Sequence, residues 1–167
     1  MNVKECYAEL NADYEGTVKR LMNEALVKRF ALKFLEDPSF SIIEEGYAKQ
    51  DAEQAFRGAH TLKGICLNLG FTQLQEVSSN LTEALCGRSF EGSQELFEKT
   101  KIEYERVKEI LKKLAKKFFK TIEQAFSACF FLLLKFEINL KFSFSYFKKC
   151  LVFEIKMQKL IFYFKKS

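Results

Sequence analysis

The stretch that decides the fold lies at residues 51–70 and has the sequence DAEQAFRGAHTLKGICLNLG. Its apolar residues recur every three or four positions, which is the spacing of one face of an α-helix. Asp51 is a good N-cap with Gln54 as its capping-box partner, and Gly70 suits the position just beyond a helix end. The stretch therefore predicts one amphipathic helix that begins after Asp51 and ends at Gly70.

The sequence upstream of this stretch predicts further helices. Two short helices are expected near residues 2–10 and 14–22, and two more over residues 24–35 and 39–48. Pro38 separates the second pair, because proline disfavours helical geometry in the residue before it and suits the first turn of a new helix. Strand-like alternation is missing from this half of the chain.

The sequence downstream of Gly70 shows the same signals. Thr72 with Gln75 repeats the capping-box pattern and predicts a helix over residues 73–85 that Gly87 closes. Ser93 is then expected to N-cap a long last helix.

The predicted fold is all-α. Short connections between helices of this length favour antiparallel neighbours, so we expect an up-and-down four-helix bundle with an N-terminal helical segment and a poorly specified C-terminal extension. The bundle is assigned to residues 1–115 and the extension to residues 116–167. Its principal helices are expected at 24–48 as a broken pair, 51–69, 72–86 and 93–115.

Charge is divided unevenly along the chain. The whole sequence carries 27 Lys and Arg against 22 Asp and Glu, a net charge of +5. Residues 1–110 carry 14 Lys and Arg against 19 Asp and Glu, a net −5, whereas residues 111–167 carry 13 Lys against three Glu, a net +10. The two parts are therefore interpreted separately, and the acidic part gives no reason to expect a nucleic-acid partner.

Several functional classes are disfavoured by composition. Five scattered Cys are too few for a disulfide scaffold, and one His without a CxxC pair excludes the common His-rich zinc sites. Neither GxxxxGK[ST] nor GxGxxG is present, so no nucleotide cofactor is expected. The longest apolar run, Ala128 to Leu134, is far shorter than the roughly 20 residues that span a bilayer. Because the N-terminus also lacks a signal sequence, we expect a cytoplasmic protein with reduced thiols.

His60 is the only imidazole of the chain. Taken alone, a single histidine is usually structural or merely exposed, but this one lies about 110° from the centre of the apolar face, so it should be exposed. Gly64, one turn later, costs the helix up to about 1 kcal/mol relative to Ala and is best explained by space for a partner or a phosphoryl group. Lys63 can hold its ammonium beside His60, and Leu67 continues the rim as an apolar docking patch.

The sequence HTLKG at residues 60–64, followed by an apolar stretch and GF at residues 70–71, resembles the H-x-x-K-G…G motif of histidine-containing phosphotransfer (HPt) domains. The resemblance covers about residues 20–114, including the order and spacing of the helices. It implies an HPt-like four-helix bundle with the motif on the second of its helices.

The resemblance also implies roles for single residues. His60 would be the phospho-accepting imidazole, attacking an aspartyl phosphate through Nε2, and Lys63 would stabilise the phosphoryl charge. Gly64 would keep the histidine accessible and Gly70 would end the helix. Many family members have a Gln near the phosphoryl group on the next helix, where this chain places Thr82, whose hydroxyl can form a hydrogen bond.

The function implied is that of a phosphorelay intermediate in two-component signal transduction. The expected partners are a response-regulator receiver domain, which brings its own Mg²⁺, and a hybrid sensor kinase, with this chain acting as a monomeric phosphocarrier without kinase activity. The acidic residue that orients the imidazole is left open between Glu44, Glu45 and another. The alternative function is a non-catalytic helical interaction module that kept the bundle but not the relay.

From Phe118 onward the chain is dominated by Lys, Phe, Leu, Ile, Ser and Tyr. Alternation predicts strands at residues 140–145 and 153–157, whereas residues 121–134 are compatible with a continued helix. A cationic segment on an anionic membrane surface and a nucleic-acid contact are two functional interpretations. We favour a third, a frameshift or read-through beyond a natural end near Leu114, because these residues are encoded by A/T-rich codons.

Overall fold

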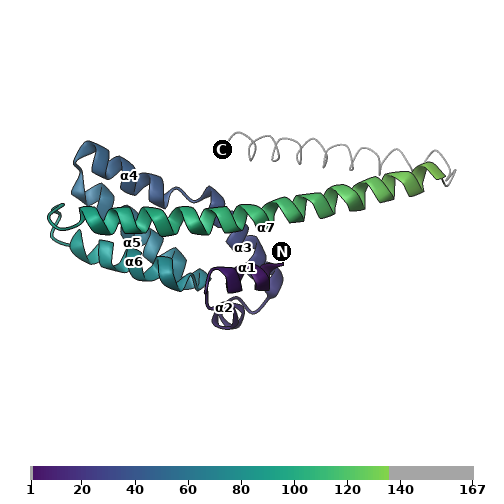
Figure 1. Ribbon diagram of the computed structural model, residues 1–167, viewed down its shortest axis with the longest axis horizontal. Coiled ribbons are helices and arrows are strands. Elements are labelled where there is room, and N and C mark those ends of the chain that lie inside the picture. The colour runs from purple at the N-terminus through teal and green to yellow at the C-terminus, as the bar shows by residue number, and fades with distance from the viewer. Residues whose placement is uncertain (1, 136–167) are drawn as a thin grey trace. The chain divides into compact units, whose positions relative to one another are not determined.

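The computed structural model describes residues 2–135, with side chains described for residues 2–117. Every regular element in this part of the chain is a helix (Figure 1). The predicted strands at 140–145 and 153–157 lie outside the described residues. The elements are α1 (Val3–Glu9), α2 (Tyr14–Leu21), α3 (Glu24–Lys33), the 3-10 turn η1 (Phe34–Glu36), α4 (Ser39–Lys49), α5 (Ala52–Leu69), α6 (Thr72–Ala84) and α7 (Gln94–Lys135).

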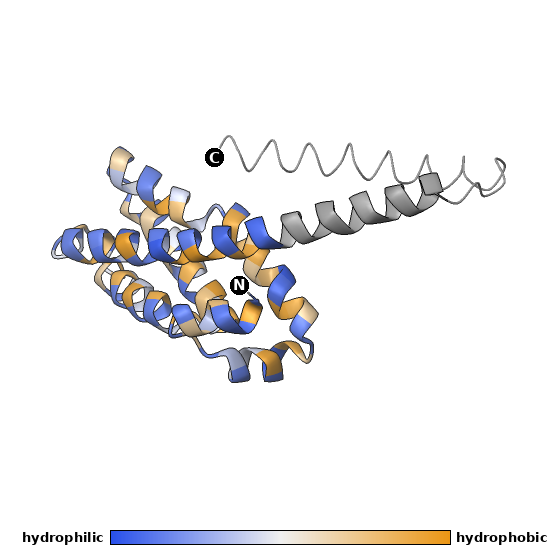
Figure 2. Ribbon diagram, turned by 45° about the vertical axis from the view of Figure 1, so that its right-hand side comes forward, coloured by the Kyte–Doolittle hydropathy of each residue, from blue (hydrophilic) through white to orange (hydrophobic). Residues whose placement is uncertain are grey.

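Helices α4, α5, α6 and the first part of α7 form the bundle, with α5 packed between α4 and α6. Figure 2 shows orange and blue segments alternating along these helices, the distribution that amphipathic helices produce. The apolar faces meet in one core, in which Leu62, Leu81 and Leu111 are fully buried. The predicted all-α, HPt-like bundle is confirmed.

Two glycines allow α4 and α5 to approach closely. A Cβ added at Gly46 would lie 2.5 Å from the Ala55 nitrogen, and one at Gly58 would lie 2.8 Å from Cγ1 of Ile43. Any side chain at either position would push the two helices apart. This close crossing therefore fixes the orientation of α5 against α4, and with it the face of α5 that points outward.

The ends of α5 are capped as predicted. The Asp51 carboxylate accepts a hydrogen bond from the Gln54 backbone N–H at 2.9 Å, and Gly70 adopts a left-handed φ of 67° beyond the last turn. The Gln54 side chain differs from the expected capping box, since its amide lies 3.3 Å from a carboxylate oxygen of Glu45. That contact crosses from α5 to α4 and replaces the local bond to the cap.

Two predicted helix ends were wrong in detail. Phe71, not Thr72, is the N-cap of α6, and the Thr72 hydroxyl donates to the Asn11 carbonyl at 2.9 Å. Gly87 does not supply the left-handed turn after α6; Arg88 does, with a φ of 55°. At Thr72 a contact outside the local sequence takes the place of the expected cap, whereas the Arg88 backbone N–H bonds the Leu85 carbonyl at 3.0 Å.

Ser93 directly precedes α7, as predicted, but its hydroxyl is not a simple cap. It donates to the Phe90 carbonyl at 2.9 Å and accepts from the Tyr47 hydroxyl at 2.8 Å. The start of α7 is thus joined to α4.

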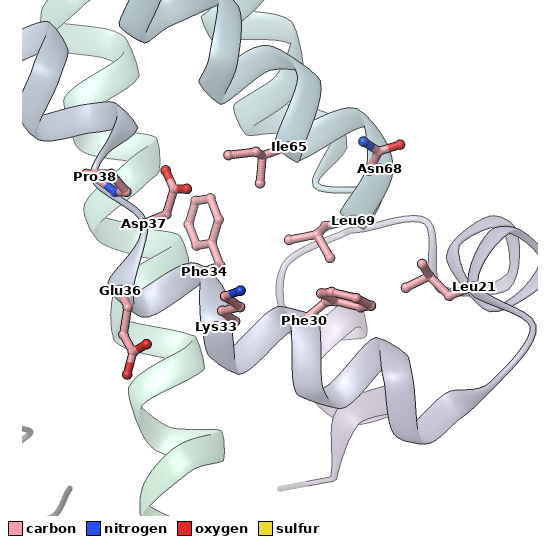
Figure 3. A pocket seen from close by; sticks show the side chains of 10 residues that line it. All are labelled: Leu21, Phe30, Lys33, Phe34, Glu36, Asp37, Pro38, Ile65, Asn68 and Leu69. Carbon is pink, nitrogen blue, oxygen red and sulfur yellow. The ribbon is translucent and has the colours of Figure 1, made fainter.

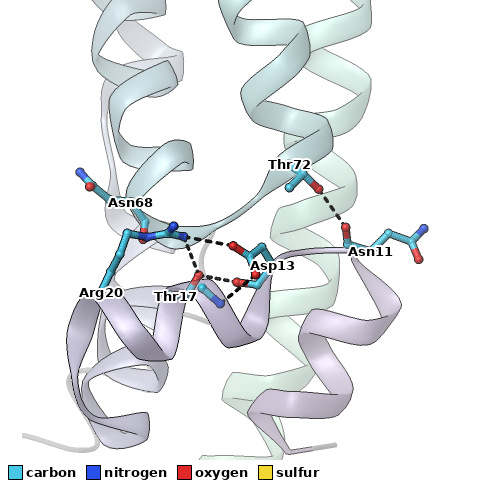
Figure 4. Close-up of polar contacts among 7 residues, drawn as sticks. Asn11, Asp13, Thr17, Arg20, Asn68 and Thr72 are labelled. Carbon is cyan, nitrogen blue, oxygen red and sulfur yellow. Dashed lines mark hydrogen bonds and ion pairs between the residues drawn. The ribbon is translucent and has the colours of Figure 1, made fainter.

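A polar network joins α2 to the turn between α5 and α6 (Figure 4). The Asp13 backbone N–H donates to the Gly70 carbonyl at 2.8 Å, and the Thr17 hydroxyl donates to the Asp13 carbonyl at 2.6 Å. Arg20 pairs with Asp13 at 3.7 Å and reaches the Asn68 carbonyl at 3.4 Å. The N-terminal helices are therefore bound to the C-terminal end of α5.

An aromatic series runs through the interior from α2 to the loop before α7. Successive ring centroids lie between 4.2 and 6.1 Å apart, which is the range of favourable aromatic pairs. The series connects the N-terminal helices to the bundle through side chains of several elements. Its members, in order of contact, are Tyr14, Tyr7, Phe71, Phe34, Tyr104, Phe40, Phe97, Tyr47 and Phe90.

The last helix continues past the boundary at 115. Helix α7 runs to Lys135, so the continued helix that the sequence allowed at 121–134 is present. The chain divides into two compact units, Met1–Lys120 and Thr121–Ser167. Among the described residues, no helix is both long enough and apolar enough to cross a membrane.

Candidate functional site

His60 lies in the middle of α5 and is exposed, as the helical-face argument predicts. Its neighbour Ala59 is fully buried, as is Leu62. The backbone at His60 is thus held by core packing on one side of the helix while the imidazole faces solvent on the other. A backbone held by core packing with an accessible ring suits a nucleophile that a partner protein must reach.

The two glycines inside α5 have different surroundings. Gly58 lies against α4, whereas a Cβ added at Gly64 would meet nothing within 4 Å. Packing therefore explains Gly58 but not Gly64, although an interior glycine costs a helix up to about 1 kcal/mol. What Gly64 does provide is an open surface one turn beyond His60.

Lys63 is half-buried and stands one turn from His60 on α5. Within the described residues it makes no ion pair, whereas nearby cations are occupied: Arg57 pairs with Glu53 at 2.9 Å and Lys49 with Glu45 at 3.1 Å. An ammonium without an acidic partner beside the only imidazole can interact with an incoming anion.

The acidic residues considered as orienting groups for His60 have other partners. Glu44 pairs with Lys101 at 3.2 Å, and Glu45 accepts from Lys49 and Gln54, contacts that hold the pKa of its carboxyl below the usual value. In the part of the chain whose side chains are described, no carboxylate bonds to His60. The ring contact of the imidazole is with Phe56.

Thr82 is buried on α6, and its hydroxyl donates to the Ser78 carbonyl at 2.6 Å. Among the residues whose side chains are described, Thr82 forms no hydrogen bond with His60. A hydroxyl that bonds the carbonyl four residues earlier in its own helix has already used its only proton.

Leu67 is 58% exposed and lies two turns beyond His60 on α5. Gly70 is buried at the end of the same helix, where a Cβ would collide with the Thr17 hydroxyl and the Asp13 carbonyl. The helix end is therefore closed as expected, and Leu67 remains available as an apolar contact for another protein.

A cavity of about 470 Å³ opens between α3, η1 and the C-terminal half of α5 (Figure 3). Sequence reasoning missed it, because its walls come from segments far apart in the chain. Phe30, which is 41% exposed, contributes to the wall. The full lining is Leu21, Phe30, Lys33, Phe34, Glu36, Asp37, Pro38, Ile65, Asn68 and Leu69.

Sequence reasoning also missed a group of side chains at the N-terminal side of His60. The Phe56 and His60 ring centroids are 6.0 Å apart with the planes inclined by 28°, and the Arg88 guanidinium carbon lies 3.7 Å from the centre of the Phe56 ring. Arg88 also pairs with Glu53. The spacing of four between Phe56 and His60 could have indicated the first contact, but nothing local indicates Arg88.

The Glu53 carboxylate holds two cations at once. Hydrogen bonding from Arg57 is the main reason that the pKa of this carboxyl lies below its usual value, and Arg88 adds to the effect. Glu53 therefore remains ionised over the physiological pH range. Among the described residues no group of three or more His, Cys, Asp and Glu is arranged to hold a metal ion.

Comparison with known proteins gives one match. The family model described as the Hpt domain matches residues 22–116, more than half of the chain. No curated protein and no solved structure matches. The matched region begins at the end of α2 and includes the segment from His60 to Gly70 with the surfaces described above.

Proposed function

The chain belongs to the Hpt domain family, and on that premise we propose that it is a phosphorelay intermediate that carries a phosphoryl group on His60. Hpt domains transfer phosphoryl groups in two-component systems and interact with receiver domains and kinases. The observation that supports the proposal best is the exposed His60 beside the open surface at Gly64, with a Lys63 that forms no ion pair among the residues whose side chains are described.

The transfer step needs only a neutral imidazole and a phosphorylated carboxylate. The Nε2 lone pair attacks the phosphorus of an aspartyl phosphate on a receiver domain, and an N–P bond forms as the P–O bond to the aspartate breaks. The carboxylate leaves with the electron pair of that bond, while the proton on Nδ1 stays in place. Attack by the carboxylate of a second receiver reverses the step and returns the imidazole unchanged.

The residues near His60 on α5 would contribute charge stabilisation, space and a contact surface to the transfer. Lys63 would stabilise the phosphoryl oxygens, and the partner receiver domain would bring the Mg²⁺ that shares this charge. Gly64 leaves room for the aspartyl phosphate, and Leu67 would contact the receiver. Because the Thr82 hydroxyl already donates its proton to the Ser78 carbonyl, we assign the charge stabilisation within this chain to Lys63.

The proposal makes the chain a phosphocarrier and not a kinase, fed by a hybrid sensor kinase or its receiver domain. We infer that it works as a monomer in the cytoplasm, where receiver domains and the ATP-dependent kinases that load them are found. No step of the transfer requires a cofactor in this chain, since the partner contributes both the phosphoryl group and the metal.

Labelling from a phosphorylated receiver domain tests the proposal. Wild-type chain should acquire phosphate that is labile in acid and stable in base, and His60→Gln should acquire none while keeping its helical circular dichroism. Full labelling of His60→Gln would refute the assignment.

The same assay distinguishes the second candidate, a non-catalytic interaction module, which the internal hydrogen bond of Thr82 favours. For such a module, receiver binding by the wild-type chain would be normal but no phosphate would appear on His60. Binding and labelling should therefore be measured on the same receiver.

A further inference from the structure

The imidazole of His60 has an occupied side and an open side along α5. Side chains of an α-helix lean toward its N-terminus, so His60 leans toward Phe56 and away from Gly64. The centroid separation of 6.0 Å and the inclination of 28° place the two rings in a loose, offset stack. One turn further on, Gly64 leaves the surface free.

The Phe56 ring is in turn held from outside α5. The guanidinium carbon of Arg88 lies 3.7 Å from the centre of the ring, which is close enough for a cation–π contact. Arg88 is fixed by its pair with Glu53 and by a hydrogen bond to the Cys86 carbonyl at 3.2 Å. A continuous stack thus runs from the loop between α6 and α7 to the imidazole.

The backbone of Arg88 adds to this arrangement. Its φ of 55° is uncommon for a residue with a side chain, although Gly87 directly before it could have supplied such a turn without strain. The loop therefore directs an arginine, and not a glycine, into the left-handed position that lies over Phe56.

We propose that Phe56 and Arg88 are positioning residues for His60: the guanidinium holds the Phe56 ring, and the ring restricts the imidazole to rotamers accessible from the side of Gly64. This inference rests on the proposed function of His60 as phosphoryl acceptor. Phosphoryl transfer depends mainly on placing the nucleophile in line with the phosphorus. An imidazole free to occupy both χ1 wells that are open to a helical residue would spend about half of its time in the productive one.

Two variants remove the stack without removing the nucleophile. Phe56→Leu keeps apolar bulk but has no ring, and Arg88→Gln removes the cation over the ring. Both should lower the maximal rate of transfer from a phosphorylated receiver by about twofold, with the half-saturating receiver concentration unchanged. Phe56→Tyr, which keeps the ring, should transfer at the wild-type rate.

Nuclear magnetic resonance of the unphosphorylated full chain gives a readout independent of transfer. Because His60 is the only histidine, its ring protons are identified without ambiguity. Phe56→Leu and Arg88→Gln should both shift these signals, because the ring current of Phe56 is lost or displaced. Arg57→Gln is the matched control, since Arg57 bonds the same Glu53 carboxylate but stands outside the stack, and it should change neither the signals nor the rate.

The outcomes separate this inference from the proposed function. Wild-type rates and unmoved His60 signals in Phe56→Leu and Arg88→Gln would overturn the positioning role and leave the relay intact. A slowed Phe56→Tyr would also count against it. If the wild-type chain took no phosphate, the proposed function would fail, and the resonance comparison alone would decide whether the stack holds the imidazole.

Discussion

At the scale of single residues, Gly58 and Gly64 inside α5 should respond very differently to substitution by alanine. Gly64→Ala adds a methyl group where nothing lies within 4 Å, so it should raise the free energy of unfolding by up to about 1 kcal/mol through helix propensity. The same methyl group narrows the approach to His60 and should slow transfer by about tenfold or more. Urea denaturation and receiver transfer assays measure the two effects separately.

Gly58→Ala is the control for this prediction. Its added carbon would lie 2.8 Å from Ile43 and 2.9 Å from the Ser39 carbonyl, so it should destabilise the fold by about 1–3 kcal/mol. If Gly64→Ala lost stability as Gly58→Ala does, the surface beside His60 would not be open.

Lys63→Ala tests the electrostatic part of the site. Removing an ammonium that has no acidic partner in the described structure breaks no ion pair, so the thermal unfolding midpoint should change little. Transfer should slow by about tenfold, because a cation near the phosphoryl oxygens is lost, and added salt should reduce the difference between variant and wild type.

Lys49→Ala is the matched control for Lys63→Ala, because it removes a surface cation that is paired with Glu45. It should leave the transfer rate of the chain as it is. Equal slowing in both variants would mean that only the overall charge matters, and Lys63 would lose its assigned role.

At the scale of helices and their ends, the local caps could be predicted and the long-range ones could not. The Asp51 cap and the Gly70 end depend on residues three or four positions apart, which a sequence displays directly. The hydroxyl of Thr72 instead bonds Asn11, 61 positions away. No local sequence pattern indicates such a partner, and none indicates that Arg88 lies over the Phe56 ring.

Substitutions at Gly70 and at Gln50 should change the free energy of unfolding in opposite directions. Both adopt left-handed backbone angles, with φ of 67° and 57°, but Gly70 also lies against Thr17 and Asp13. Gly70→Ala should therefore cost more than about 1 kcal/mol of unfolding free energy, whereas Gln50→Gly should stabilise the chain by roughly 0.5 kcal/mol.

Chemical denaturation of the two variants beside the wild type checks both signs. A neutral Gly70→Ala would contradict the close contact between α2 and the end of α5. A destabilised Gln50→Gly would show that the hydrogen bond from its side chain to the Tyr47 carbonyl outweighs the backbone strain.

At the scale of the whole molecule, burial determines the reactivity of the cysteines. Burial raises the pKa of the Cys6 thiol to about 12 and also raises the pKa of the Cys66 thiol, whereas Cys86 is exposed. Since a raised pKa leaves almost no thiolate near neutral pH, iodoacetamide should modify Cys86 in the native chain and spare Cys6 and Cys66.

Peptide mass spectrometry after brief alkylation measures this difference. Cys6 and Cys66 should react only after denaturant is added, and their reaction should follow the unfolding transition. Rapid alkylation of Cys66 in the native chain would contradict the packing of α5 against the core.

The overall architecture could be predicted because helical periodicity and turn residues are local properties. Apolar spacing and capping residues predict the principal helices of the bundle between residues 24 and 115, and the exposure of His60 follows from its angle on one helix. The surroundings of the site could not be predicted, since the cavity beside Ile65 and the contact of Arg88 with Phe56 join segments distant in sequence. Those contacts exist only once the helices have packed.

The aromatic series inside the bundle also gives the protein an optical signature. The chain contains no Trp, so its near-ultraviolet circular dichroism comes chiefly from tyrosine and phenylalanine. Four of the six tyrosines belong to the series. A variant that loosens the core would lose this signal while its far-ultraviolet helical signal persists. Each substitution can thus be checked for intact packing by circular dichroism of the unlabelled chain.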